Sequence, residues 1–472
     1  MFDLSALELS SAIKEKKISV IDAVSSYIAL AKENKYNAFI SVCEEEALVR
    51  AQHVQAQIDR GEAPSPLAGV PIAIKDNIST KGLPTTCASK TLENYRPVFN
   101  ATVIEKIEQA GLIIVGKTNL DEFAMGGSSE TGYFGPVKNP ADTARVAGGS
   151  SGGNAAAVAG GEALLSLGSD TGGSIRQPCS FCGITGMKPT YGAVSRYGLV
   201  AYASSLDQIG VMGRNVADCA ALLEIIWGAD ERDSTCVVKS PLERKKIANP
   251  RIGVPRNYFA AGIDADVKAR VLAAADDLAA AGASITEFDM PLMEYMVPAY
   301  YIIACAEASS NLACFDGFEY GHRSAAAETL SDVFRLSRNE GFGLEVKRRI
   351  MLGSFVLSSG YYDAYYKKAL QVRALIKDAY NRLFADYDMI LSPIAPTTAF
   401  KIGENIDDPL KMYMGDIYTV SVNLAGLPSI ALPCGTDGGG LPVGFQLIGD
   451  SFSDGALLEV AGMYQERTRF HL

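Results

Sequence analysis

A serine that follows two glycines is the residue best placed to act as a nucleophile in this chain. The segment Gly168–Pro178 reads Gly-Ser-Asp-Thr-Gly-Gly-Ser-Ile-Arg-Gln-Pro, and its second serine, Ser174, stands just before an expected helix. Because Gly172 and Gly173 carry no side chain, a substrate carbonyl can approach the backbone N–H groups there closely. Backbone donors beside a hydroxyl provide the geometry of an oxyanion hole. The pattern therefore predicts acyl transfer to Ser174.

Two further groups lie upstream in an order that suits this chemistry. The segment Ala147–Asn154 reads Ala-Gly-Gly-Ser-Ser-Gly-Gly-Asn and contains Ser150, and Lys75 ends the apolar run Val70–Lys75. A lysine at the end of a strand is ordinarily structural, and a serine in a glycine-rich loop is ordinarily a loop residue. Their joint occurrence with the second glycine–serine run is what favours hydrolytic acyl transfer without histidine.

Histidine chemistry remains an alternative with one candidate residue. The chain has three histidines, and only His322 stands where it could complete a serine–histidine–aspartate triad, because His53 lies in a polar helical stretch and His471 is the penultimate residue. The segment Gly149–Gly153 also matches the G-x-S-x-G nucleophile elbow. That motif needs a strand before the serine, whereas residues 140–147 have the composition of a loop.

Composition limits the class of protein. The chain has 472 residues, of which 48% are hydrophobic and 21% charged, so it can bury a large core. Its net charge of −11 disfavours strong binding of nucleic acid by this chain alone. Nine cysteines, an odd number scattered along the chain, argue against a secreted disulfide framework. Without an apolar run of about 18 residues, a cytoplasmic protein with no membrane contact is expected.

The hydrophobic pattern predicts an α/β fold in one domain, residues 1–472. Residues 1–60 have helical periodicity, with Ser19 as a helix N-cap. Strand, helix and strand patterns then follow at 69–74, 101–110 and 111–116, which indicates a βαβ unit.

The remaining pattern divides this domain into three further regions. A catalytic core is expected at about 65–215, and a mostly helical excursion at about 230–390, with long amphipathic runs at 265–282 and 362–385. Strand patterns return at 389–392, 428–433 and 442–449, and we expect these strands to rejoin the first sheet.

Two motifs resemble other sites but fit them poorly. Gly111–Thr118 matches the phosphate-loop pattern, yet its four variable residues are Leu-Ile-Ile-Val, which form a strand rather than a flexible loop. Cys179 and Cys182 form a lone C-x-x-C pair one turn into a helix, where core packing is the better interpretation. We therefore expect neither nucleotide nor metal in this chain.

Together, Lys75, the Gly148–Gly153 run and the Gly168–Pro178 run resemble the amidase signature family. The resemblance spans nearly the whole chain; at Cys179 the sequence departs from the small residue typical of the family. It implies an amidase-signature fold, with a mixed β-sheet covered by helices on both faces. It also implies that Ser174 is the nucleophile, that Ser150 relays its proton across a cis Gly149–Ser150 peptide, and that Lys75 is the neutral base. The backbone of Thr171, Gly172, Gly173 and Ser174 would form the oxyanion hole.

Within this family, four segments resemble the glutaminase subunits of glutamyl-tRNA(Gln) amidotransferases. The segments are Lys75–Ile78, Lys117–Gly126, Ser358–Lys368 and Asn423–Pro428. The resemblance implies that the chain releases ammonia from glutamine for partner subunits, a tRNA-binding one and a small accessory one. The tRNA-binding partner would use ATP and Mg²⁺ on glutamyl-tRNA(Gln), and aspartyl-tRNA(Asn) is a further possible acceptor.

The same resemblance points to substrate-binding residues. Arg349 would hold the α-carboxylate of glutamine, with Arg348 as the alternative, and Asp416 would hold the α-ammonium. Tyr300 is a weaker candidate for the pocket wall. A stand-alone amidase acting on small amides would lack such a charged pair, and a catalytically silent scaffold would have no reason to retain Lys75 and both serines.

Overall fold

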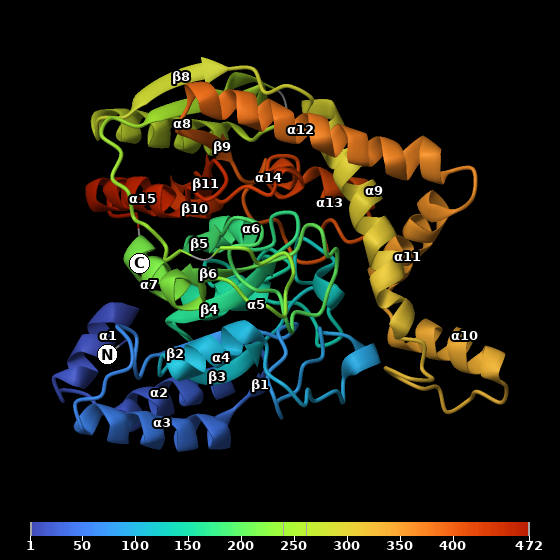
Figure 1. The fold of residues 1–472 in the computed structure, drawn as a ribbon, viewed down its shortest axis with the longest axis horizontal. Coiled ribbons are helices and arrows are strands. Elements are labelled where there is room, and N and C mark those ends of the chain that lie inside the picture. The colour runs from blue at the N-terminus through green and yellow to red at the C-terminus, as the bar shows by residue number, and fades with distance from the viewer. Residues whose placement is uncertain (1, 239, 261, 471–472) are drawn as a thin grey trace.

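An 11-stranded mixed sheet forms the centre of the computed structural model, which describes residues 2–238, 240–260 and 262–470 (Figure 1). The strand order is β1-β3-β2-β4-β6-β5-β10-β11-β9-β7-β8. The bounds of the strands are β1 (Phe39–Val42), β2 (Pro71–Lys75), β3 (Ile113–Thr118), β4 (Leu165–Asp170), β5 (Thr185–Lys188), β6 (Gln208–Gly213), β7 (Arg251–Pro255), β8 (Ser284–Phe288), β9 (Met389–Pro393), β10 (Ser429–Thr436) and β11 (Pro442–Gly449).

Helices flank this sheet along its whole length (Figure 1). Their bounds are α1 (Ala6–Lys14), α2 (Val20–Glu33), α3 (Glu44–Asp59), α4 (Thr102–Gln109), α5 (Gly152–Ala159), α6 (Arg176–Cys182), α7 (Val216–Ile226), α8 (Ala265–Ala280), α9 (Met293–Asn311), α10 (Leu330–Gly341), α11 (Leu344–Leu357), α12 (Lys367–Asp386), α13 (Pro409–Met414), α14 (Val420–Ala425) and α15 (Asp454–Thr468). Ser19 caps α2 as predicted, because its side chain accepts from the N–H of Asp22.

The predicted βαβ unit is present as β2, α4 and β3. Strand β2 pairs in parallel with both β3 and β4, so it lies inside the sheet. Every residue of β2 and β3 is buried, which explains their nearly continuous apolar sequences. The unit brings the end of β2, and with it Lys75, into the middle of the molecule.

Helices cover both faces of the central strands. A Cβ on Gly168 of β4 would meet Ser151 and Ile175, which precede α5 and α6. A Cβ on Gly213 of β6 would meet Cys219 of α7 instead. Gly213 pairs with Leu165, three residues from Gly168, so the two glycines face opposite sides of the sheet. This arrangement is the predicted α/β architecture.

The strands near the C-terminus rejoin the first sheet as predicted. Strand β10 pairs antiparallel with β5, and β11 lies between β10 and β9. The sequence analysis was incomplete at both ends of the sheet. Residues 1–60 are not entirely helical, because β1 forms the edge beside β3, and the excursion at 230–390 contains β7 and β8, which form the other edge.

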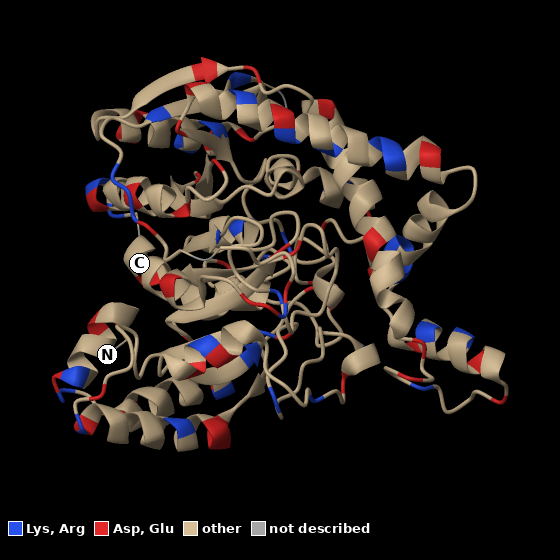
Figure 2. Cartoon of the chain, in the orientation of Figure 1, with Lys and Arg blue, Asp and Glu red and all other residues tan. Residues whose placement is uncertain are grey.

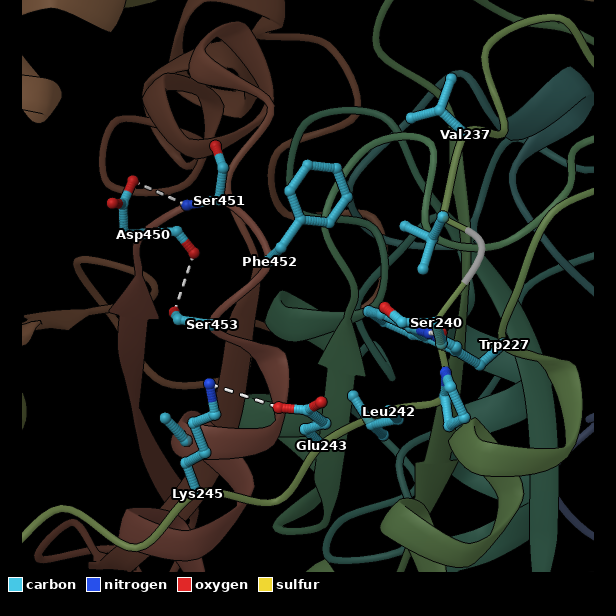
Figure 3. Close-up of a pocket in the computed structure, with 13 residues that line it drawn as sticks. Trp227, Val237, Ser240, Leu242, Glu243, Lys245, Asp450, Ser451, Phe452 and Ser453 are labelled. Carbon is cyan, nitrogen blue, oxygen red and sulfur yellow. Dashed lines mark hydrogen bonds and ion pairs between the residues drawn. The ribbon is translucent and has the colours of Figure 1, made fainter.

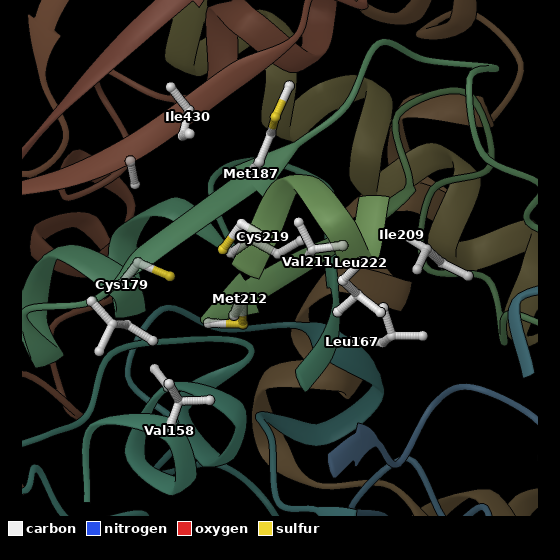
Figure 4. Packing of buried hydrophobic residues seen from close by; sticks show 14 of the residues in the cluster. Val158, Leu167, Cys179, Met187, Ile209, Val211, Met212, Cys219, Leu222 and Ile430 are labelled. Atoms are coloured by element: carbon white, nitrogen blue, oxygen red, sulfur yellow. The ribbon is translucent and has the colours of Figure 1, made fainter. Parts of the chain in front are cut away.

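Apolar side chains between the central strands and α7 form a continuous core. Figure 4 shows part of it, including Leu167, Val211, Met212 and Leu222. Charged residues lie mainly on the outer helices, and both signs are interspersed along α12 (Figure 2). Among the residues described, none of the helices combines the length and apolar character that crossing a membrane requires.

Candidate active site

Lys75 lies fully buried at the end of β2, in the middle of a group of serines. Its Nζ is 2.8 Å from Oγ of Ser150, 2.8 Å from Oγ of Ser151 and 3.0 Å from Oγ of Ser169. The structure thus places two of the three predicted catalytic side chains in contact. It adds Ser151 and Ser169, to which the sequence analysis assigned no role. Ser151 also donates its backbone N–H to the carbonyl of Ser174 at 3.1 Å, which joins the two serine segments.

The amine of Lys75 sits in surroundings that favour its neutral form. Burial lowers the pKa of Lys75 from its usual value of 10.5 to about 7, against the opposing influence of Asp121, Asp170 and Asp207. In the part of the chain that the structure describes, no carboxylate forms an ion pair with it. A lysine whose pKa lies near neutrality can both accept and return a proton.

The peptide bond between Gly149 and Ser150 is cis, as the family resemblance implied. A Cβ on Gly149 would lie 2.1 Å from Oδ2 of Asp121, so the segment packs directly against that carboxylate. The N–H of Gly149 donates to Oε1 of Gln177 at 2.9 Å. The chain leading to Ser150 is a loop and α5 follows it, so the G-x-S-x-G match is not a nucleophile elbow.

Ser174 lies in the tight connection between β4 and α6 and is 7% exposed. A Cβ on Gly172 would lie 2.4 Å from the hydroxyl of Tyr300, and a Cβ on Gly173 would lie 2.5 Å from Oγ1 of Thr419. Gly173 also has a φ of 135°, in a region that other residues avoid. A side chain at either position would overlap Tyr300 or Thr419, so both positions before Ser174 require glycine.

The backbone N–H groups of this turn differ in their availability. The N–H of Gly173 donates to Oδ1 of Asp170 at 2.9 Å. Those of Thr171, Gly172 and Ser174 have no acceptor within the described chain. The structure differs from the expected oxyanion hole at Gly173, because the carboxylate of Asp170 turns back onto the turn that follows it. Three of the four expected donors remain available.

A buried ion pair holds this turn. Arg176 approaches both carboxylate oxygens of Asp170 at 3.1 Å. It continues to Oδ1 of Asn423 at 2.6 Å, to Oε1 of Gln446 at 2.8 Å and to the carbonyl of Thr419. Although burial raises the pKa of Asp170, the guanidinium holds it well below its usual range. Arg176 thereby ties the serine turn to the C-terminal part of the fold.

The two predicted substrate-binding residues line one cavity of about 390 Å³. Nη1 of Arg349 donates to the hydroxyl of Tyr202 at 2.5 Å, while its Nη2 has no acceptor among the described residues. Oδ2 of Asp416 accepts from the hydroxyl of Tyr301 at 2.6 Å, and within the same residues Oδ1 has no donor. Burial raises the pKa of Asp416 to about 6. Among the described residues, Arg349 thus keeps Nη2 and Asp416 keeps Oδ1 available for a ligand.

Two side chains connect this cavity to the serine cluster. Gln177 donates to the carbonyl of Gly127, which lines the cavity, and accepts from the N–H of Gly149. The hydroxyl of Thr419 contacts the carbonyls of Asp416, at 3.1 Å, and Gly172, at 2.5 Å. The cavity wall and both serine segments are therefore directly bonded to one another.

Tyr300 does not line this cavity, and its neighbour Tyr301 does. Consecutive residues of α9 point about 100° apart, so Tyr300 instead packs on Gly172 beneath the serine turn. The sequence analysis placed the tyrosine one residue away. Arg348, the alternative to Arg349, also lines the cavity.

Glu345 and Tyr413 also line this wall and were not predicted from the sequence. Glu345 precedes Arg349 by four residues in α11, a spacing at which opposite charges meet on a helix. This spacing is the feature of the sequence that could have identified Glu345 as a partner of Arg349.

The residues of the phosphate-loop-like motif, the C-x-x-C pair and the histidine alternative all have structural partners. Lys117 lies in β3, buried, 3.0 Å from Oδ1 of Asp76, and is not part of a loop. Cys179 and Cys182 pack in the core. His322 hydrogen-bonds Glu340 at 2.9 Å, and in the described chain its side chain contacts none of the serines named above.

A separate cavity of about 560 Å³ lies between the segment from Trp227 to Lys245 and the connection of β11 with α15 (Figure 3). Phe452 enters it from one side and Trp227 from the other, with an ion pair of Glu243 and Lys245 at its edge. None of the predicted site residues lines it. The 390 Å³ cavity is therefore the candidate substrate site.

Comparison with known proteins agrees with this geometry. The family model described as Amidase matches residues 22–458. The chain is 57% identical to a protein of Agathobacter rectalis named as the A subunit of glutamyl-tRNA(Gln) amidotransferase, over 99% of this chain and 94% of that one. A protein of the same name from Carboxydothermus hydrogenoformans is 54% identical, over 100% and 98%. The solved structure of such an A subunit from Thermotoga maritima is similar with a TM-score of 0.80 and 44% identity, covering 99% of this chain and 95% of that one. The chain belongs to the amidase family.

Proposed function

We propose that this chain hydrolyses the side-chain amide of glutamine and supplies the ammonia to partner subunits that amidate glutamyl-tRNA(Gln). The observation that carries the proposal is the pairing of a lysine–serine cluster with a cavity in which, among the described residues, one guanidinium nitrogen has no acceptor and one carboxylate oxygen has no donor. The similarity to amidotransferase A subunits supports the same substrate. A stand-alone amidase for small neutral amides has no use for such a charged pair.

In the proposed mechanism, the Oγ of Ser174 attacks the amide carbonyl of glutamine. The proton of Ser174 passes to Ser150, and the proton of Ser150 passes to the neutral amine of Lys75, 2.8 Å away. The free N–H groups of Thr171, Gly172 and Ser174 stabilise the oxyanion. Return of the proton to the amide nitrogen releases ammonia and leaves a γ-glutamyl ester on Ser174. Water, deprotonated through the same relay, then hydrolyses the ester to glutamate.

Arg349 and Asp416 would select the substrate in the cavity that they line, next to the serine cluster. Nη2 of Arg349 is available for the α-carboxylate and Oδ1 of Asp416 for the α-ammonium. The side-chain amide would then point toward the serines, because Gln177 and Thr419 fix the cavity wall relative to Ser150 and Gly172.

The second half reaction would belong to partner subunits. A tRNA-binding partner would use ATP and Mg²⁺ to activate the glutamyl-tRNA, with aspartyl-tRNA(Asn) as a further acceptor, and a small accessory subunit would complete a heterotrimer. The acidic charge of this chain suits a role in which the partner contacts the tRNA.

Replacing the nucleophile tests the first step. Ser174→Ala should abolish ammonia release from glutamine and the covalent γ-glutamyl adduct, because no hydroxyl remains to form the ester. Mass spectrometry of the protein incubated with glutamine measures the adduct, and its detection on the variant would disprove the assignment. An assembled complex with this variant should still amidate glutamyl-tRNA when supplied with ammonium salt.

Lys75 and His322 distinguish the two possible bases. Lys75→Ala should lower kcat/KM for glutamine by roughly 10²–10⁴-fold, as expected for loss of a general base. His322→Ala should leave it within about tenfold, since that histidine contacts Glu340 and none of the serines. A folded but inactive His322 variant, confirmed by circular dichroism, would instead support a histidine triad.

The pH dependence of kcat/KM should report both shifted groups. Lys75 acts in its neutral form, so activity should be present above its pKa of about 7 and fall as pH decreases. Asp416 binds ammonium in its ionised form, so glutamine use should fall further below about pH 6. A plain aliphatic amide lacking the amine should show only the first decline. Identical profiles for the two substrates would contradict the role of Asp416.

Variants of the charged pair test substrate choice. Arg349→Ala should weaken use of glutamine by about 2–4 kcal/mol, because the carboxylate loses its partner. Turnover of a plain aliphatic amide should change far less, and Asp416→Ala should likewise spare amides without the amine. Steady-state kinetics of both variants with both substrates measure this. Intact glutamine turnover in Arg349→Ala would rule out Arg349 as the carboxylate ligand.

A further inference from the structure

Glu345 holds together the basic end of the candidate substrate cavity. Its Oε1 accepts from Nε of Arg349 at 2.8 Å and from the hydroxyl of Tyr413 at 2.9 Å. Its Oε2 pairs with Nη1 of Arg348. The side chain of Glu345 is 12% exposed, and all four residues line the cavity. One carboxylate therefore contacts every guanidinium of this wall.

These contacts determine which edge of Arg349 faces a ligand. Glu345 occupies the Nε edge, and Tyr202 takes Nη1. The rings of Tyr202, Tyr301 and Tyr413 lie 5.4–5.5 Å from the guanidinium carbon and enclose it. Only Nη2 is left without an acceptor among the described residues. The arginine thus has one available donor group in a fixed direction.

The same set of contacts reaches the acidic end of the cavity. Tyr301 and Tyr413 stack with their ring centroids 4.0 Å apart. The hydroxyl of Tyr413 donates to Glu345, and that of Tyr301 donates to Asp416. The stacked pair therefore sets the spacing between the guanidinium of Arg349 and the carboxylate of Asp416.

Charge balance in the cavity adds a second consequence. Its wall carries the two guanidinium groups and four carboxylates: Arg348, Arg349, Glu130, Glu345, Asp407 and Asp416. Among the carboxylates, Glu345 is the one in contact with both arginines. Without its charge, the basic end would attract any carboxylate, including ligands that have no ammonium group to offer Asp416.

We propose that Glu345 is a positioning and specificity-determining residue: it orients Arg349 and restrains the attraction of the arginines for anions, so that the cavity selects a zwitterionic amide over an anionic one. This inference rests on the proposed function, because it assumes glutamine as the ligand.

Binding to a protein that cannot turn over its ligand provides the test. In the Ser174→Ala background, calorimetry would compare glutamine with 4-carbamoylbutanoate, which keeps the amide and carboxylate but lacks the ammonium. Glu345→Gln retains the size and the hydrogen-bond acceptor but removes the charge. It should reduce the preference for glutamine over 4-carbamoylbutanoate by roughly tenfold, since a unit charge in contact with both arginines is lost.

Further variants separate this role from a merely structural one. Glu345→Asp keeps the charge, so both ligands should bind more weakly while the preference stays within about threefold. Tyr413→Phe keeps the ring stack and the charge of Glu345 but removes one of its hydrogen-bond donors, so both ligands should bind more weakly while the preference stays within about threefold. Glu340→Gln removes a carboxylate that pairs with His322 outside the cavity, and it should change nothing.

The outcomes distinguish the two proposals. Glutamine binding with an unchanged preference in Glu345→Gln would overturn the role of Glu345 alone. Absence of glutamine binding to the Ser174→Ala parent would overturn the proposed function and this inference with it.

Discussion

The candidate active site depends on burying one lysine with which no carboxylate of the described residues forms an ion pair. Lowering the pKa of Lys75 from 10.5 to about 7 disfavours its protonated form by roughly 5 kcal/mol. The sheet provides this environment, because β2 lies between β3 and β4 and all of its residues are buried. The remaining partners of the amine are serine oxygens. Those hydroxyls hydrogen-bond the amine in either protonation state without fixing its charge, as a proton relay needs.

Several aspartates lie near enough to Lys75 to favour its protonated form, and each of them has other partners. Asp76 pairs with the ammonium of Lys117, and Asp170 pairs with the guanidinium of Arg176. Asp121 accepts from backbone N–H groups and from the hydroxyl of Thr131. Asp207 accepts from the hydroxyl of Thr171 and from two backbone N–H groups. Their charges are thus balanced or solvated locally. The lysine in the phosphate-loop-like motif is one of these partners, and its contacts with Asp76, Ile78 and Thr85 account for its burial.

The sequence predicted the parts of the site that depend on local pattern. Lys75 ends an apolar strand, and Ser150 and Ser174 stand in glycine-rich turns, so residue type and spacing marked all three as candidates. The edge strands β1 and β8 were missed because they are short and partly exposed, and their pairing is decided by distant segments. The same limit applies to Tyr301. Helix phase relative to a cavity decides whether it or Tyr300 faces the substrate, and one sequence contains no signal for that phase.

The proposed catalytic groups and the proposed substrate-binding groups come from different halves of the chain. Lys75, Ser150 and Ser174 lie in the first half, whereas Arg349 and Asp416 come from the region of α11 and α13. A solved structure at 31% identity keeps the fold with a TM-score of 0.86, so the sheet can hold its shape while much of the sequence changes. Because Thr419 bonds the backbone carbonyls of Gly172 in the first half and Asp416 in the second, side chains on the cavity wall can change without moving the serine turn. In the proposed mechanism the chemistry thus depends on the sheet, and the choice of amide depends on the helices around it.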